Sequence, residues 1–216
     1  MREALVYAVG IAVSPVAIAA VLLLLSCRHA VRNAVSFLLG WTVGVAAATV
    51  VLVALVNQTG ITDSNPEWIA ISELTIGAGF LLAALAVLWR RRHSRDELSP
   101  PWVDAVDRFT TARSTGLGLV LSGANPKVVA LSLGAALSLS QAHAGTALTA
   151  TTVLLFAAIG TAGASVPLAL YLAAPVRAEL VLARMRAWLG RRETIVLVMT
   201  GVLVSVLFTA DGLRGI

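Results

Sequence analysis

The residues with the clearest capacity for chemistry lie together in one apolar run, where Asn125, Pro126 and Lys127 follow one another. Lys127 is the single lysine of the chain and falls near the middle of the run 117–140. A cation at the centre of a membrane span costs roughly 2.5–3.5 kcal/mol, so it usually faces a cavity or a partner. Pro126 cannot donate to the helical ladder and disfavours α geometry at Asn125. This stretch therefore predicts a broken helix that holds a positive charge and free backbone groups inside a membrane.

Two further sites could take part in the same chemistry. Ser14 and Pro15 lie midway through the first apolar run and predict a second helix break. Glu73 lies near the start of the run 69–89. It is a carboxylate at the aqueous interface, a partner for Lys127 or a site for proton coupling. Lys127 itself is either a structural residue or a contact for substrate or ion.

Enzymatic and metal centres have little support in the residues. The chain has no Gly-x-Ser-x-Gly and no His-Glu-x-x-His sequence. A serine–lysine dyad of Ser14 and Lys127 would need the two helix breaks to meet. The one cysteine excludes an intrachain disulfide, and the three histidines lie far apart in predicted loops. We predict no catalytic residues, no metal site and no cofactor.

The composition is that of an integral membrane protein. Of the 216 residues, 58% are hydrophobic and 12% are charged, whereas a soluble domain has about 25% charged residues. The net charge is +5, but the arginines lie in short segments between apolar runs. That distribution is typical of membrane orientation rather than of nucleic-acid binding. We predict an all-α integral membrane protein that is surrounded by membrane lipids and has no nucleic-acid partner.

Six apolar runs reach the roughly 20 residues that a membrane-spanning helix needs. They cover residues 4–26, 34–56, 69–89, 117–140, 146–173 and 194–210. Between them, the segments 27–33, 90–116 and 174–193 hold two, six and five arginines, and the opposite side holds only Arg2 and Arg214. The positive-inside rule therefore places the three segments in the cytoplasm and both termini outside.

The placement of breaks and glycines indicates two repeats of three spans, residues 1–89 and 117–216, within one transmembrane domain of residues 1–216. The linker 90–116 is predicted to contain an amphipathic helix on the membrane surface. The matching features are the breaks Ser14-Pro15 and Asn125-Pro126, and the glycine pairs Gly40 with Gly44 and Gly160 with Gly163. Three is an odd number of spans, so the second repeat is inverted, which indicates a transporter with its site at the membrane midplane. The glycines allow close helix approach, either within one protomer or in a homodimer.

These motifs resemble those of the LysE transporter superfamily, with a Ser-Pro motif halfway along the first span and an Asn-Pro-Lys motif opening the fourth. Within it, the chain is most similar to the GAP branch, actinobacterial proteins named for addressing glycopeptidolipid and sulfolipid to the cell surface. The resemblance implies an exporter or lipid-translocation factor of the bacterial inner membrane. It also implies that Ser14, Pro15, Asn125, Pro126 and Lys127 line the central site. Amino-acid exporters of the superfamily typically have a Pro-Gly-Pro version of the first motif, whereas this chain has Ser-Pro-Val-Ala, which favours the lipid-linked branch.

The leading hypothesis is a transporter that moves an anionic lipid or a lipid-linked cell-envelope precursor. Each helix N-terminus at the breaks carries roughly half a positive charge, and Lys127 adds a full one, so the site suits phosphate, sulfate or carboxylate. Two alternatives stay open. One is an exporter of a small, amino-acid-type metabolite, and the other is a non-transporting scaffold subunit of a lipid-export complex. A scaffold should tolerate Lys127→Met, whereas a transporter should lose its activity.

Overall fold

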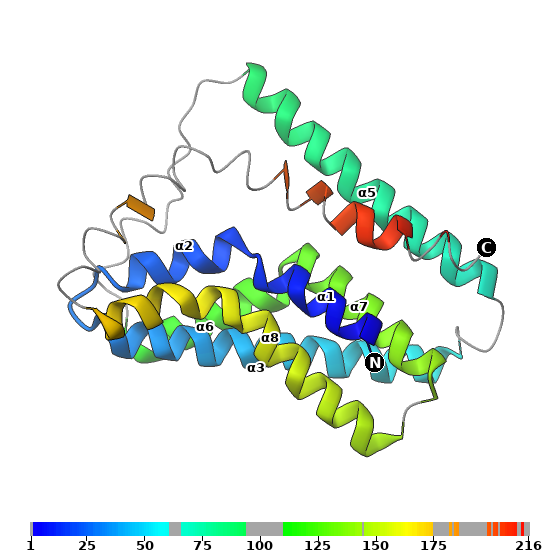
Figure 1. Cartoon of the computed structure of the whole chain (residues 1–216), viewed down its shortest axis with the longest axis horizontal. Coiled ribbons are helices and arrows are strands. Elements are labelled where there is room, and N and C mark those ends of the chain that lie inside the picture. The colour runs from blue at the N-terminus through cyan, green and yellow to red at the C-terminus, as the bar shows by residue number, and fades with distance from the viewer. Residues whose placement is uncertain are drawn as a thin grey trace.

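The structure, a computed structural model, describes residues 2–60, 66–93, 110–143 and 145–174, with residues 182, 184–185, 198–199, 201–202, 204–210 and 213. The described residues form helices and contain no strand. The helices are α1 (Arg2–Ala12), α2 (Pro15–Leu24), α3 (Ala30–Thr59), α5 (Pro66–His93), α6 (Thr111–Gly123), α7 (Pro126–Gln141) and α8 (Thr146–Ala173). All of these except α5 form one bundle, and α5 lies apart from it beside the described C-terminal residues (Figure 1).

Both helix breaks that the prolines predict are confirmed. α1 and α2 meet at an angle of 45°, and α6 and α7 meet at 61°. The residue before each proline has extended backbone, with ψ of 105° at Ser14 and 113° at Asn125. The proline ring forces this conformation on the preceding residue, and Pro15 and Pro126 then start the next helix at its first position, where no N–H is required.

Two helices, α3 and α8, are each long and apolar enough to cross a membrane, and four spans result if each bent pair counts as one. These four spans correspond to the predicted runs 4–26, 34–56, 117–140 and 146–173. The run 69–89 lies within α5, which has the apolar segment Leu74–Trp89. The run 194–210 is described only in part. Six membrane helices in two inverted repeats therefore stay a prediction.

The helix α6 extends beyond its apolar run toward the N-terminus. The Thr110 side chain caps it, since its hydroxyl accepts a hydrogen bond from the backbone N–H of Arg113 at 3.4 Å. The capped first turn carries polar residues, so Arg113 belongs to the end of α6 rather than to a separate surface helix. The rest of the predicted amphipathic helix falls on residues 94–109, outside the part of the chain that is described.

Glycines let two pairs of helices approach to backbone contact. On α3, Gly40 lies against the carbonyl of Thr115 of α6, and Gly44 lies against the side chain of Ser122. On α8, Gly163 lies against the carbonyl of Ala12 at the end of α1. In each broken pair, the first helix therefore packs on an unbroken helix from the other half of the chain: α1 packs on α8, and α6 packs on α3.

The same helix pairs have further glycine contacts. Gly118 of α6 lies against the carbonyl of Phe37, and a Cβ at Gly160 would lie 3.1 Å from the side chain of Ile11. These contacts lie within one chain, and a homodimer stays a prediction. The α5 helix packs differently, because Gly77 lies against Thr209 and Gly201 lies against Ala84, which joins α5 to the C-terminal residues.

Hydrogen bonds between side chains connect α3 to α7 and α8. Thr42 and Thr161 share a hydrogen bond of 2.9 Å. The hydroxyl of Thr49 donates to the hydroxyl of Ser132 at 3.2 Å. The hydroxyl of Ser140 donates to the side-chain amide oxygen of Asn57 at 2.8 Å. Such bonds hold helices together where lipid offers no hydrophobic driving force for association. They make α3 the element against which both halves of the chain are positioned.

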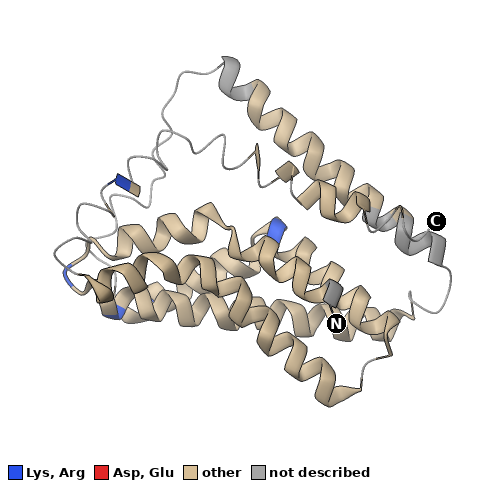
Figure 2. Ribbon diagram, viewed as in Figure 1, with Lys and Arg blue, Asp and Glu red and all other residues tan. Residues whose placement is uncertain are grey.

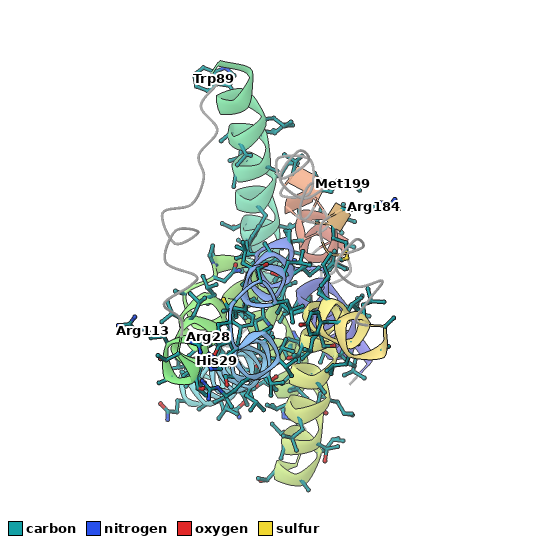
Figure 3. The ribbon with its side chains drawn as sticks, turned by 90° about the vertical axis from the view of Figure 1, so that its left-hand side faces the viewer. Arg28, His29, Trp89, Arg113, Arg184 and Met199 are labelled. Carbon is teal, nitrogen blue, oxygen red and sulfur yellow. The ribbon has the colours of Figure 1, made fainter. Side chains whose placement is uncertain are left out.

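The arginines that are coloured in Figure 2 lie at one end of the bundle. Arg28, Arg113 and Arg184 are labelled in the view that looks onto this end (Figure 3). Lys127 differs from them because it lies inside the bundle, at the second residue of α7. One basic end is the arrangement that the positive-inside rule requires of a membrane protein. The side of the membrane that this end faces stays a prediction.

Candidate functional site

The two helix breaks line a common cavity of about 190 Å³. Ser14 and Pro15 from the first break contribute to its lining, as do Asn125 and Lys127 from the second. Pro126 is exposed and does not line it. The structure thus brings together residues from both breaks, although more than a hundred residues separate them in the sequence.

The Lys127 side chain connects the two breaks directly. Its ammonium nitrogen donates a hydrogen bond of 2.7 Å to the backbone carbonyl of Val13, and the residue is only 6% exposed. The Val13 carbonyl is free to accept because α1 ends at Ala12 and the first backbone bond of α2 runs from Ile18 N–H to the Ser14 carbonyl. The break in one half of the chain therefore supplies the acceptor for the cation of the other half.

The two helices that begin at the cavity have different N-terminal caps. The Asn125 side chain caps α7, since its carbonyl oxygen accepts a hydrogen bond of 3.0 Å from the backbone N–H of Lys127. Ser14 occupies the equivalent position before α2, but its hydroxyl makes no capping bond. The residue is 2% exposed, and its side chain has no hydrogen-bond partner among the described residues. The first N–H groups of α2 therefore lack a side-chain acceptor.

Positive charge lies at the cavity, and the negative C-terminal ends of α1 and α6 lie at the same two breaks. The N-termini of α2 and α7 both lie at the cavity, each equivalent to roughly half a positive charge, and the Lys127 ammonium adds a full charge. No carboxylate is found among the described residues that line the cavity. The side chain of Glu73 on α5 lies outside the described residues, so its pairing with Lys127 and its part in proton coupling stay predictions. Among the described residues, no three His, Cys, Asp or Glu side chains could together hold a metal ion.

Sequence reasoning missed two parts of this site. The Val13 carbonyl could have been found, because a proline two positions later removes the helical order that would satisfy it. The other part is an apolar wall supplied by α5 and one C-terminal residue, comprising Phe80, Ala83, Ala84, Val87 and Gly201. Nothing in their residue types distinguishes them from the many other apolar residues of the chain.

The predicted glycines lie away from the cavity lining. Gly40 and Gly44 face α6, and Gly160 and Gly163 face α1. They hold the first half of each broken pair in place, so they support the site by positioning the helices that end at it.

Comparison with known proteins gives one family. The family model SfLAP, described as Sap, sulfolipid-1-addressing protein, matches residues 4–214. No curated protein and no solved structure gives a significant match.

Proposed function

The chain belongs to the sulfolipid-1-addressing protein family, and from that premise we propose that it is a membrane transporter for an anionic lipid. Membership of this family indicates a role in lipid export or another role at the membrane. The observation that carries the finer proposal is the cavity at the breaks, where the Lys127 ammonium and two helix N-termini lie together. The substrate would be a lipid or lipid-linked cell-envelope precursor with a phosphate, sulfate or carboxylate headgroup.

The chemistry of binding follows from the donors at the cavity. Lys127 has three N–H donors, and one of them is engaged by the Val13 carbonyl. The remaining donors and the uncapped N-terminus of α2 can bind the oxygens of an anionic headgroup. In a bond from Lys127 to an anion both partners are charged, whereas the Val13 carbonyl is neutral, so an anion competes well for the ammonium. The headgroup would thus replace water at a site that otherwise leaves a cation in an apolar region.

Movement across the membrane would come from rocking of two inverted repeats against each other, with the cavity between them. The reciprocal packing of α6 on α3 and of α1 on α8 supports such a repeat. Placement in the LysE superfamily, in a bacterial inner membrane with the arginine-rich end in the cytoplasm, belongs to the same proposal. An exporter of a small anionic metabolite would use the same cavity and differ only in what lies beyond the headgroup.

A scaffold function has one observation in its favour, the hydrogen bond between Lys127 and Val13. That bond joins the two breaks and would stabilise the fold without any substrate. Under this alternative, the chain is a non-transporting subunit of a lipid-export complex. Lys127 would then have no partner other than the backbone.

The experiment that tests the proposal is lipid translocation in liposomes that contain the purified protein. Fluorescent phosphatidylglycerol is compared with fluorescent phosphatidylcholine, and the fraction that crosses is read from quenching by an impermeant reductant. We expect selective movement of the anionic lipid and its loss in Lys127→Met. Val129→Met is the matched control, because Val129 is an exposed residue of α7 outside the cavity lining.

Equal rates for Lys127→Met and Val129→Met would contradict the proposal. If neither labelled lipid moves in wild type, with or without an imposed pH gradient, the scaffold alternative gains support. Movement of an anionic amino acid in the same liposomes, without lipid, would favour the metabolite exporter.

A further inference from the structure

The cavity has an apolar wall in addition to its cationic end. Phe80, Ala83, Ala84 and Val87 of α5 line it, and their spacing of three and four residues places them on one face of that helix. Gly201 lies next to them, where a Cβ would be 3.0 Å from the Cβ of Ala84. Small residues therefore keep space open along α5. A ligand that filled the whole cavity would have an anionic end and a hydrocarbon part.

The cationic end has a buried polar group that points to a ligand. Ser14 is 2% exposed, lines the cavity and has a hydroxyl without a hydrogen-bond partner among the described residues. The Ser14 oxygen is not fully enclosed by protein, so it is open to the cavity, where a water or a ligand can bind it. The hydroxyl lies beside the uncapped N-terminus of α2 and in the same lining as Lys127. Together these donors can surround the oxygens of one anionic group.

The cavity lining includes an exposed residue of α5. Ser14 and Lys127 are buried, whereas Ala83 is exposed. In a helix within a membrane, an exposed residue of this kind faces lipid. The volume of about 190 Å³ equals roughly six water molecules at about 30 Å³ each, so it holds a headgroup and the first part of one chain. The remainder of a lipid would have to extend past Ala83 into the bilayer.

We infer that the cavity is a slot for an anionic amphiphile, with the headgroup at Ser14 and Lys127 and one acyl chain leaving past Ala83 along α5. This inference rests on the proposed function and adds to it the side on which the ligand enters. Ala83 is then a residue that determines specificity, because its small side chain sets the width of the exit. A small metabolite would fit inside the cavity without passing Ala83, whereas the acyl chain of a lipid would have to pass it.

The test uses a fatty acid that carries a photoactivatable diazirine in the middle of its chain. The purified full-length protein in mild detergent is mixed with the probe and irradiated, and the labelled peptide is identified by mass spectrometry. Ala83→Phe fills the exit, and Ala86→Phe is the matched control. Ala86 is also an exposed alanine of α5, but it does not line the cavity. Both positions are exposed, so neither substitution disturbs the packed core.

We expect wild-type label on the peptide that contains residues 80–87. Ala83→Phe should reduce labelling there about tenfold relative to Ala86→Phe, since losing the burial of roughly two methylene groups costs about that factor in affinity. Lys127→Met should reduce it as well, because the carboxylate of the probe loses its cation.

The other outcomes separate the two proposals. If Ala83→Phe and Ala86→Phe label equally while Lys127→Met loses label, the acyl-chain slot is wrong and the anion site of the proposed function stands. Label that maps away from α5 has the same meaning when it depends on Lys127. If Lys127→Met labels as well as wild type, both the slot for an anionic amphiphile and the proposed function are overturned.

Discussion

Replacing Gly118 with alanine should destabilise the protein by forcing α3 and α6 apart. A Cβ at Gly118 would overlap the carbonyl of Phe37 and would lie 2.7 Å from the backbone nitrogen of Trp41. It would also lie 3.1 Å from the carbonyl carbon of Gly40. All three are backbone atoms of α3, so no change of side-chain rotamer can relieve the overlap. The helices would have to separate along their whole contact.

The magnitude comes from two opposing effects. Overpacking of a well-packed core typically costs 1–3 kcal/mol, and alanine stabilises a helix over glycine by up to about 1 kcal/mol. Gly116 separates the two effects, because it lies on the same helix and a Cβ there would meet no atom within 4 Å. Gly116→Ala should show only the gain in helix propensity. The difference between the two variants should therefore be about 1–3 kcal/mol, with Gly118→Ala the less stable.

The assay is unfolding of the purified protein in mixed micelles with an increasing fraction of sodium dodecyl sulfate, followed by circular dichroism. Gly118→Ala should unfold at a clearly lower fraction than wild type, and Gly116→Ala at the same fraction or a higher one. If the two alanine variants unfold together, the backbones of α3 and α6 do not approach as described. The reasoning about the glycine contacts at Gly40 and Gly44 would then fail with it.

Four further substitutions have defined outcomes in the same unfolding assay. Asn125→Ala should lower the free energy of unfolding by about 1 kcal/mol because it removes the cap of α7. Ser14→Ala removes no capping bond and should leave the free energy of unfolding nearly unchanged. A larger loss of stability for Ser14→Ala than for Asn125→Ala would contradict the cap assignment. Thr49→Val removes the interhelical hydrogen bond to Ser132 and should cost about 0.6 kcal/mol, the average for such bonds in membranes. If stability does not change measurably, this hydrogen bond does not stabilise the fold. Lys127→Met loses a bond worth roughly 1.5–3 kcal/mol but removes a buried cation that costs roughly 2.5–3.5 kcal/mol, so it should stay folded. Strong destabilisation would mean that the bond to Val13 outweighs the cost of burying the cation.

The sequence contained enough information to predict where the helices break. Proline constrains its own backbone and that of the residue before it, so Ser14-Pro15 and Asn125-Pro126 have the same local effect wherever they lie. Pro167 shows the limit of this rule, because α8 continues through it as one helix. There the hydroxyl of Ser165 donates to the Ala162 carbonyl at 2.7 Å, one residue before Gly163, whose carbonyl loses its helical donor to the proline.

Contacts between distant segments were beyond the reach of the sequence. The charge of Lys127 predicted that it faces a cavity or a partner. The structure gives the Val13 carbonyl as its partner, which no residue type could reveal because every residue has a carbonyl. Gly118 had no spacing that singled it out, yet it contacts α3 as closely as Gly40 does. The apolar wall of the cavity could not be predicted either, because Ala83 and its neighbours on α5 are apolar like most of the chain. A single sequence shows where proline constrains the backbone, but contacts between distant segments can be identified only from the structure.

The reciprocal packing of the broken helices also constrains how the chain can be made. The carbonyl of Ala12 meets its partner only after Gly163 has been synthesised, 151 positions later (163 minus 12). At roughly 5–20 residues per second, that interval lasts on the order of 8–30 s. The Val13 carbonyl likewise waits for Lys127. The first half of the protein therefore enters the membrane with its break unsatisfied, and its core is completed only when the second half has arrived.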